Sequence, residues 1–181
     1  MPRIFTGIEI PAGTRDALAL LRGGLPGARW IDAENYHITL RFIGDIDGRT
    51  ADEIAEMLSL VQRPPFNLAF AGLDFFGSRA PHALIARIAP SRELSELQAE
   101  QERSMQRLGL RPEARKFAPH ITLARLRGTN ETQMAAHLSE RAGVFIPPFS
   151  VDRFALFSAR ESVGGGPYVV EAAYPLSGQA A

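Results

Sequence analysis

The tetrapeptide His-Ile-Thr-Leu occurs twice in this chain, at residues 37–40 and again 83 positions later at residues 120–123. The flanks agree in kind, since NYHITLRFIG and APHITLARLRG each continue through an arginine to a glycine. Such a repeat predicts two related halves that each contribute one β-strand. Side chains alternate along a strand, so His37 and Thr39 share one face, and His120 and Thr122 likewise. Each copy therefore anchors its aliphatic residues in a core and presents an imidazole beside a hydroxyl on the other side.

The rest of the chain predicts strands and helices in a mixed order. Apolar stretches bounded by turn residues predict strands at residues 3–10, 28–31, 35–43, 66–73, 83–88, 117–126, 149–158 and 168–176. Turns are expected at 74–81 and at Gly164-Gly165-Gly166. Helices are expected at 11–22, at 50–62 behind a capping box of Thr50 and Glu53, between Ser91 and Gly109, and at 130–141. Helices inserted among strands without strict alternation favour an α+β fold over a parallel doubly wound sheet.

Composition excludes several classes of protein. With 181 residues, 45% of them hydrophobic, and zero net charge, the chain suits one packed domain and not disorder. The absence of cysteine rules out disulfides, thiolate metal sites and cysteine nucleophiles. A pI of about 6.9 argues against coating nucleic acid through bulk charge, although a local cationic cleft stays compatible with it. No signal peptide or membrane-spanning run is recognisable, so we expect a cytoplasmic protein, and a small cleft needs no second subunit, which favours a monomer.

The repeated motif indicates acid–base chemistry at phosphorus. If the halves face one another, His37, Thr39, His120 and Thr122 converge on one pocket. Two imidazoles with an ordinary pKa of about 6.5 supply a general acid and a general base near neutral pH. Hydroxyls and a strand-end arginine stabilise charge on phosphorus oxygens, which suits in-line displacement at a phosphodiester. A two-histidine metal site is the rival interpretation, but it lacks a carboxylate at ligand spacing, so we expect no metal and no cofactor.

The two motifs are flanked by the short segments Arg29-Trp30, Glu34-Asn35, Arg41-Phe42-Ile43-Gly44 and Phe117-Ala118-Pro119-His120. Together with the motifs, these segments resemble the 2H phosphoesterase superfamily, and within it the RNA 2′,3′-cyclic phosphodiesterases, also called 2′-5′ RNA ligases of the LigT/ThpR type. The resemblance extends over nearly the whole chain. The resemblance implies one domain over residues 1–181 with a bilobal, pseudo-symmetric α+β fold. Mainly antiparallel sheets, outer helices and a central cleft are expected, each lobe supplying one His-X-Thr-X strand.

The resemblance also implies an activity and residue roles. The activity is metal-independent hydrolysis of an RNA terminal 2′,3′-cyclic phosphate to a 2′-phosphomonoester, with 2′-5′ ligation as the reverse sense. His37 matches the proton donor, His120 the proton acceptor, Thr39 and Thr122 the phosphate-holding hydroxyls, and Arg125 an arginine that contacts the ligand. Expected partners are RNA ends or small cyclic-phosphate nucleotides, with no membrane.

Strand alternation conflicts with one of these roles. It turns Arg125 away from His120 unless the strand bends, bulges or ends, whereas Arg41 falls on the favourable face. His82 is expected in a turn or at a strand edge, and His137 on a solvent-facing side of a helix. Aromatic residues that either pack in the core or stack on a base are Trp30, Tyr36, Phe42, Phe76 and Tyr168.

Two alternative functions remain open from the residues. One is another 2H activity, on small cyclic nucleotides or 2′-5′ linkages. The other is an RNA-end binding module that uses the cleft without turnover.

Overall fold

The computed structural model describes residues 3–159 and 165–178. Its strands are β1 (Arg3–Glu9), β2 (Ala28–Trp30), β3 (His37–Gly44), β4 (Phe66–Leu68), β5 (Phe70–Phe76), β6 (Ala83–Ile88), β7 (His120–Leu126), β8 (Phe149–Val151), β9 (Arg153–Ala159) and β10 (Val169–Pro175). The helices are α1 (Ala12–Ala19), α2 (Gly48–Ser59), α3 (Arg92–Arg107) and α4 (Glu131–Glu140), with a 3-10 turn, η1, at Ala33–Asn35. The strand pairs among these residues are antiparallel, which confirms the predicted α+β class. None of the described helices is long and apolar enough to cross a bilayer.

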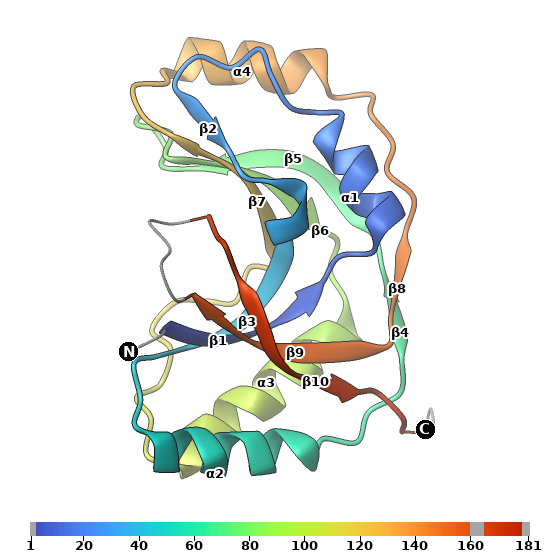
Figure 1. Ribbon diagram of the computed structural model, residues 1–181. Helices are drawn as coiled ribbons and strands as arrows, with labels where there is room; N and C mark the ends of the chain where they lie inside the picture. The colour runs from blue at the N-terminus through green and yellow to red at the C-terminus, as the bar shows by residue number, and fades with distance from the viewer. Residues whose placement is uncertain (1–2, 160–164, 179–181) are drawn as a thin grey trace.

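One large sheet runs through the molecule and opens in its middle. Its order is β10-β9-β1-β3-β7-β6-β5, with β2 added on β7. In the described part of the chain, β3 and β7 pair only between Ile38 and Ile121, so the sheet splays on either side of this point. We call β1, β3, β9 and β10 the lower half-sheet and β2, β5, β6 and β7 the upper half-sheet, as Figure 1 shows them. Helices α2 and α3 lie on the lower half-sheet, and α1 and α4 lie beside the upper one (Figure 1).

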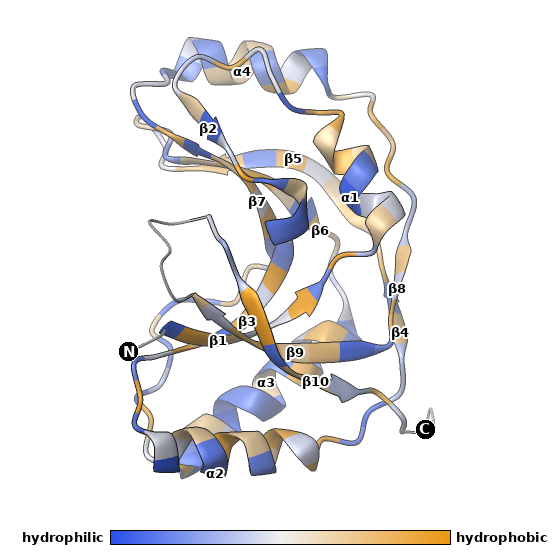
Figure 2. Cartoon of the chain, viewed as in Figure 1, coloured by the Kyte–Doolittle hydropathy of each residue, from blue (hydrophilic) through white to orange (hydrophobic). Residues whose placement is uncertain are grey.

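The aliphatic residues of both tetrapeptides are buried in one core. Ile38, Leu40, Ile121 and Leu123 all belong to the main hydrophobic cluster, as strand alternation predicts. Helix α3 covers this core with Leu94, Leu97 and Met105 and begins at the predicted cap, where the Ser91 hydroxyl accepts a hydrogen bond from the Leu94 amide. Figure 2 shows hydrophobic residues along the lower half-sheet and a mixed surface on α2 and α3.

The predicted capping box of α2 is wrong. The helix begins at Gly48, and Asp47 is its N-cap, because its Oδ1 accepts a hydrogen bond from the Thr50 amide at 2.8 Å. Thr50 therefore lies inside the first turn. An aspartate is as good a cap as a threonine, so local preference alone did not separate the two positions.

Two predicted strands are each divided between two sheets. Residues 66–73 contain β4, which pairs with β8 in a separate two-stranded sheet, and the start of β5. Strand β5 ends at Phe76, so it extends into the first part of the turn expected at 74–81. Residues 149–158 divide in the same way at Asp152, between β8 and β9. The apolar composition runs on across both junctions, because Phe70, Leu73 and Phe75 of β5 pack partly buried against the main core and the middle of β9 is buried.

The expectation of a solvent-facing His137 is also wrong. This side chain is only 2% exposed, and its ring lies 6.0 Å from that of Trp30, between α4 and the upper half-sheet. Met134, one helical turn earlier, is buried on the same side of α4. Desolvation lowers the pKa of His137, which keeps this packed imidazole neutral. Of the predicted glycine turn, Gly164 lies outside the described residues.

Candidate active site

A cleft of about 430 Å³ opens where the two half-sheets splay apart. All five residues singled out from the sequence line it, which are His37, Thr39, His120, Thr122 and Arg125. The two motifs run past each other in opposite directions, since Ile38 and Ile121 form an antiparallel pair. This register sets each imidazole across from the hydroxyl of the other strand.

Both catalytic candidates have the same hydrogen-bonding arrangement. Nδ1 of His37 donates to the carbonyl oxygen of Asn35 at 2.9 Å, and Nδ1 of His120 donates to that of Ala118 at 2.7 Å. A carbonyl oxygen accepts only, so each neutral ring carries its proton on Nδ1 and leaves Nε2 with a free lone pair. The Thr39 hydroxyl lies 3.0 Å from Nε2 of His37 and donates to it in the neutral state.

Among the described residues, more aromatic rings enclose the imidazole of His37 than that of His120. Three aromatic rings surround His37, those of Phe5, Phe157 and Tyr168, with centroid distances of 4.9, 5.7 and 4.8 Å. Desolvation by this enclosure lowers the pKa of His37 to about 4, and the charges of His120 and Arg125 act in the same direction. The pKa of His120 is also lowered, again chiefly by desolvation and then by the charge of Arg125. In the free protein both rings are therefore neutral at pH 7.

A bulge explains how Arg125 reaches the cleft. In the β6–β7 ladder Leu84 pairs with Ala124 and Ile85 with Thr122, so Leu123 is an extra residue on β7. A bulged residue shifts the alternation that follows it, which turns the next positions to the other face. Ala124 is consequently buried and Arg125 is exposed in the cleft.

The same bulge occurs at the matching place in β3. Thr6 pairs with Arg41 and Gly7 with Thr39, so Leu40 is the extra residue there. The predicted orientation of Arg41 is therefore wrong, because the bulge turns it inward to 6% exposure, while Phe42, 59% exposed, lines the cleft. Phe42 and Arg125 are equivalent positions of the two repeats.

The buried side chain of Arg41 has partners beneath the lower half-sheet. Its guanidinium forms an ion pair with Glu102 of α3 and donates to the carbonyl oxygens of Phe42 and Arg111, the latter at 2.5 Å. The interactions attach the segment that follows α3 to the bulged strand. This segment carries Arg115 into the cleft lining.

The cleft is strongly cationic for a chain of zero net charge. Beside Arg125, its described lining includes Arg3, Arg115 and His82, and it contains no aspartate or glutamate. Neither Arg3 nor Arg115 was predicted from the sequence, because both lie outside the two tetrapeptides. His82 was expected at a turn or strand edge and does precede β6, but the fold also turns that edge toward the cleft. Within the described ranges, no three His, Asp or Glu side chains gather in a way that could hold a metal ion.

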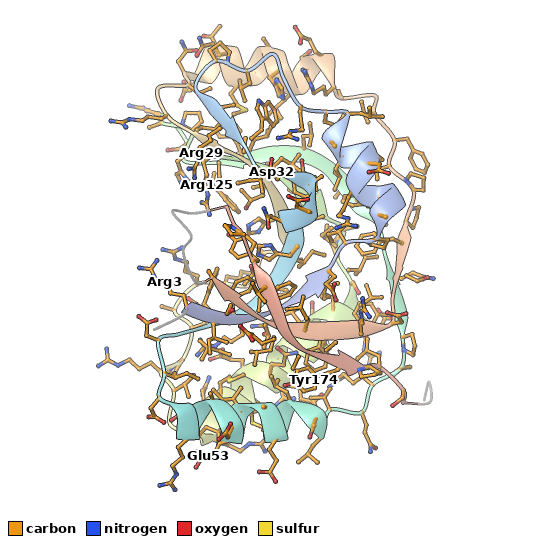
Figure 3. The ribbon with its side chains drawn as sticks, in the orientation of Figure 1. Arg3, Arg29, Asp32, Glu53, Arg125 and Tyr174 are labelled. Atoms are coloured by element: carbon orange, nitrogen blue, oxygen red, sulfur yellow. The ribbon has the colours of Figure 1, made fainter. Side chains whose placement is uncertain are left out.

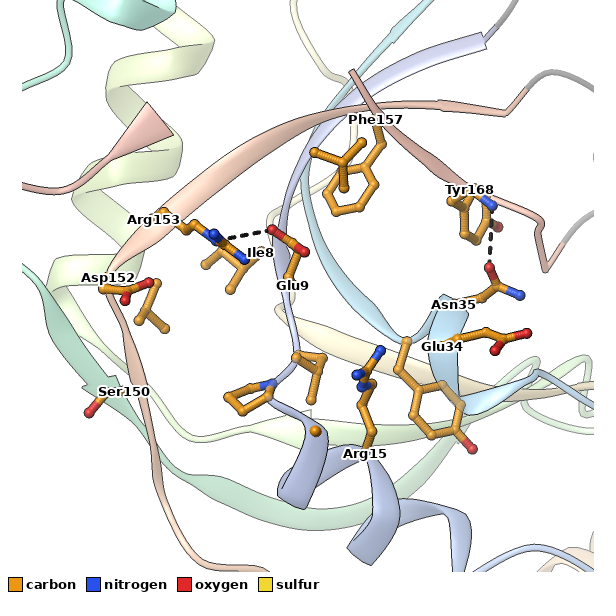
Figure 4. Close-up of a pocket in the computed structure, with 16 residues that line it drawn as sticks. Ile8, Glu9, Arg15, Glu34, Asn35, Ser150, Asp152, Arg153, Phe157 and Tyr168 are labelled. Carbon is orange, nitrogen blue, oxygen red and sulfur yellow. Dashed lines mark hydrogen bonds and ion pairs between the residues drawn. The ribbon is translucent and has the colours of Figure 1, made fainter. Parts of the chain in front are cut away.

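A second cavity of about 440 Å³ lies beyond the wall formed by Asn35 and Tyr168, which line both spaces. Figure 4 shows the Tyr168 amide donating to the Asn35 side chain at 3.2 Å and Glu9 paired with Arg153 at 3.2 Å. This cavity combines Glu9, Glu34 and Asp152 with two arginines and contains neither motif histidine. Its mixed charge gives no preference for an anion, so the cleft is the candidate active site.

An α+β chain that turns two histidines, two threonine hydroxyls and an arginine toward one cationic cleft has the architecture of a two-histidine phosphoesterase. The model of the family described as LigT-like phosphoesterases matches residues 8–85 and 88–168, so this chain belongs to that family.

Several relatives carry the name RNA 2′,3′-cyclic phosphodiesterase. One from Geobacillus stearothermophilus is 33% identical over 96% of this chain, which spans 57% of that relative's length. One from Aeropyrum pernix is 33% identical over 73% of this chain and 74% of its own. One from Bacillus subtilis is 29% identical over 86% of this chain and 87% of its own.

Solved structures share the fold. Thermus thermophilus TT0787 covers 98% of this chain and 100% of its own, with a TM-score of 0.80 and 20% identity. Escherichia coli LigT in complex with 3′-AMP covers 97% and 99%, with a TM-score of 0.75 and 24% identity. These likenesses confirm the predicted α+β architecture with mainly antiparallel sheets.

Proposed function

We propose that this protein hydrolyses the 2′,3′-cyclic phosphate at an RNA end to a 2′-phosphomonoester. Membership of the LigT-like family and the shared name of its relatives support this activity. Escherichia coli LigT has been crystallised with 3′-AMP and with phosphate, ligands that carry the groups such a reaction handles. The observation that carries the proposal is the matched pair of imidazoles that line one cleft, each with Nδ1 bound to a backbone carbonyl, so that Nε2 is the nitrogen left to exchange a proton.

In the proposed reaction His120 is the general base and His37 the general acid. Nε2 of His120 takes a proton from water, whose oxygen forms a bond to phosphorus, while the bond from phosphorus to the 3′ oxygen breaks. Nε2 of His37 gives its proton to the departing 3′ oxygen. Exchange with solvent then restores both protonation states. The same sequence with a 5′ hydroxyl in place of water forms a 2′-5′ phosphodiester as the 3′ oxygen departs, and its reverse cleaves such a linkage and re-forms the cyclic phosphate.

The polar neighbours hold the phosphoryl group. The hydroxyls of Thr39 and Thr122 donate to its non-bridging oxygens, and the guanidinium of Arg125 balances their charge. A bound phosphate anion raises the pKa of the buried His37, which charges the proton donor at the moment it is needed. No step in this scheme uses a metal ion.

Phe42 is the aromatic residue best suited to the base of the terminal nucleotide. Phe76 packs edge-on against the ring of His120 and Tyr168 against that of His37, both with centroids 4.8 Å apart. Phe42 lines the same cleft with 59% of its surface exposed, so it offers a face for stacking.

The test is incubation with adenosine 2′,3′-cyclic phosphate, with and without EDTA, followed by separation of 2′-AMP from 3′-AMP. We expect 2′-AMP at the same rate in both samples. Formation of 3′-AMP would show that the assigned orientation is reversed, and a loss of activity in EDTA would contradict the metal-independent scheme. No turnover by the unmodified protein would leave a binding module.

A pair of histidine variants tests the roles. His120→Ala should lower kcat by about 10²–10⁴-fold while 2′-AMP still binds, since removing a general base costs this much. His82→Ala is the matched control, because His82 lines the same cleft but belongs to neither motif, and its kcat should stay within a few fold of the unmodified protein.

A further inference from the structure

The cationic residues of the cleft extend well beyond the reacting groups. Arg3, Arg115 and Arg125 line it, and none of the three forms an ion pair with any residue that the structure describes. Figure 3 shows Arg3 on the lower half-sheet and Arg125 on the upper half-sheet, on the same side of the molecule. A cluster of unpaired guanidinium groups without a carboxylate is a binding surface for anions.

The three arginines come from different parts of the fold. Arg3 begins β1, whereas Glu9 at the other end of that strand pairs with His37. Arg115 follows α3 on the segment that the Arg111 carbonyl attaches to Arg41. Arg125 lies on the same strand as His120 and Thr122, and its charge lowers the pKa of both imidazoles. Arg125 is therefore assigned to the reacting phosphate, and Arg3 and Arg115 are left for a different anion.

The length of the cleft indicates which kind of molecule carries the second anion. Its floor follows β3 from His37 through Thr39 and Phe42 to Gly44, which is roughly 20 Å at the rise of a β-strand. A nucleic-acid strand stacked as in duplex DNA advances about 3.4 Å per nucleotide, so this floor is longer than one nucleotide. Arg3 and Ala159 line the end that is remote from the histidines.

We propose that Arg3 and Arg115 form a second anion subsite, which binds a phosphate upstream of the reacting cyclic phosphate. The proposal rests on the function proposed above and specifies its substrate class, namely a nucleotide end that carries at least one further phosphate. Two sources provide that chemistry: the backbone of an RNA chain, and the 5′-phosphate of a single nucleotide. Arg41 supports the subsite, since its hydrogen bond to the Arg111 carbonyl attaches the Arg115 segment to β3.

The experiment compares four substrates at constant ionic strength: adenosine 2′,3′-cyclic phosphate, the same compound with a 5′-phosphate, and di- and triadenylates ending in the cyclic phosphate. We expect kcat/KM of the unmodified protein to rise at least tenfold when the further phosphate is present. A rise already with the 5′-phosphorylated mononucleotide assigns the subsite to a 5′-phosphate. A rise only with the longer substrates assigns it to the RNA backbone.

Arg3→Gln and Arg115→Gln should each abolish most of this gain and leave kcat/KM for adenosine 2′,3′-cyclic phosphate unchanged. The slope of log kcat/KM against log salt should fall by about 0.7 for the longer substrates, the value for one phosphate contact to a single strand. Arg103→Gln is the control, because Arg103 is exposed on α3 and does not line the cleft. Equal kcat/KM for all four substrates, or an equal loss on all of them, would overturn the proposal.

Failure of the proposed function gives a different result. If no substrate is hydrolysed, binding of a 5′-labelled oligoadenylate 3′-phosphate by fluorescence anisotropy still tests the subsite. Weaker binding by Arg115→Gln and unchanged binding by Arg103→Gln would support the subsite without turnover, and equal affinities would refute it.

Discussion

The kcat/KM should increase as the pH falls below 7, because the enclosed His37 imidazole is almost entirely neutral at that pH. With a pKa of about 4, about one His37 ring in a thousand is protonated at pH 7 and about one in ten at pH 5. His37 is the proposed proton donor, so only the protonated fraction of the free protein is active. Lowering the pKa of a donor thus moves the optimum to lower pH, in the opposite direction to lowering that of a base.

The second imidazole sets the other limit. The pKa of His120 also lies below 6.5, so this proposed base is already neutral at pH 7 to 8. Over that range kcat/KM follows the protonated fraction of His37 and should rise about tenfold for each unit by which the pH falls. It should pass through a maximum below pH 6.5 and then decline as His120 is protonated. The two limbs report macroscopic values of the coupled pair.

The assay measures kcat and kcat/KM for adenosine 2′,3′-cyclic phosphate from pH 4.5 to 9 at constant ionic strength, with circular dichroism to verify folding. The bound anion raises the pKa of the donor, so the kcat profile should lie at higher pH than that of kcat/KM. A kcat/KM optimum above pH 7, or a profile flat from pH 5 to 9, would refute the reasoning.

Tyr168→Ala provides an independent check of the cause. Tyr168 packs its ring edge-on against that of His37, so its removal admits water to the imidazole and should raise the pKa of His37 toward its ordinary value. The alkaline limb of kcat/KM should then move to higher pH by as much as about two units. An unshifted limb would show that desolvation by this wall is not the cause.

Three further outcomes follow from the described contacts. Glu102→Gln should lower the free energy of unfolding by about 3 kcal/mol in urea titrations, because it leaves the buried Arg41 without its carboxylate. Phe42→Ala should raise KM for adenosine 2′,3′-cyclic phosphate by a factor corresponding to about 1–3 kcal/mol of lost stacking, whereas Phe145→Ala, an exposed phenylalanine outside the cleft, should leave KM unchanged. Asn35→Ala removes the acceptor of the Tyr168 amide but keeps the backbone hydrogen bond to His37. Because Asn35 then only positions the ring of Tyr168 against His37, the variant should lower kcat more than it changes KM, and a change in KM alone would contradict this role.

Strand alternation predicted the faces of the site correctly only as far as the bulges. Within each tetrapeptide the imidazole and hydroxyl share the cleft face and the aliphatic residues are buried, as the two-residue period requires. At the next residues, Arg41 and Ala124, the side chain lies on the face opposite to the predicted one. Leu40 and Leu123 are extra residues in their strands, although their apolar side chains resemble those of ordinary core positions. Nothing in the sequence distinguishes a bulged leucine from a paired one, which is why Arg41 was assigned to the cleft.

Other residues were missed because their position depends on contacts far away in sequence. Arg3 enters the cleft through the ladder of β1 with β3 and β9, and Arg115 through a segment attached by Arg41. The burial of His137 depends on the packing of α4 beside Trp30. The histidine alone does not indicate that it is buried, whereas the apolar Met134 on the same face of α4 indicates that this face packs inward.

The twin bulges also explain how a repeated scaffold produces an unsymmetrical cleft. Each turns one residue outward and one inward. The bulge of β7 places a guanidinium in the cleft directly, as Arg125, and buries the small Ala124. The bulge of β3 presents the aromatic Phe42 and buries Arg41, whose contacts with Glu102 and the Arg111 carbonyl hold the segment that carries the guanidinium of Arg115 into the cleft. One cation therefore comes from the same strand as His120 and Thr122, and the other reaches the cleft from a separate segment. A substrate with an aromatic base and more than one phosphate matches that order of groups.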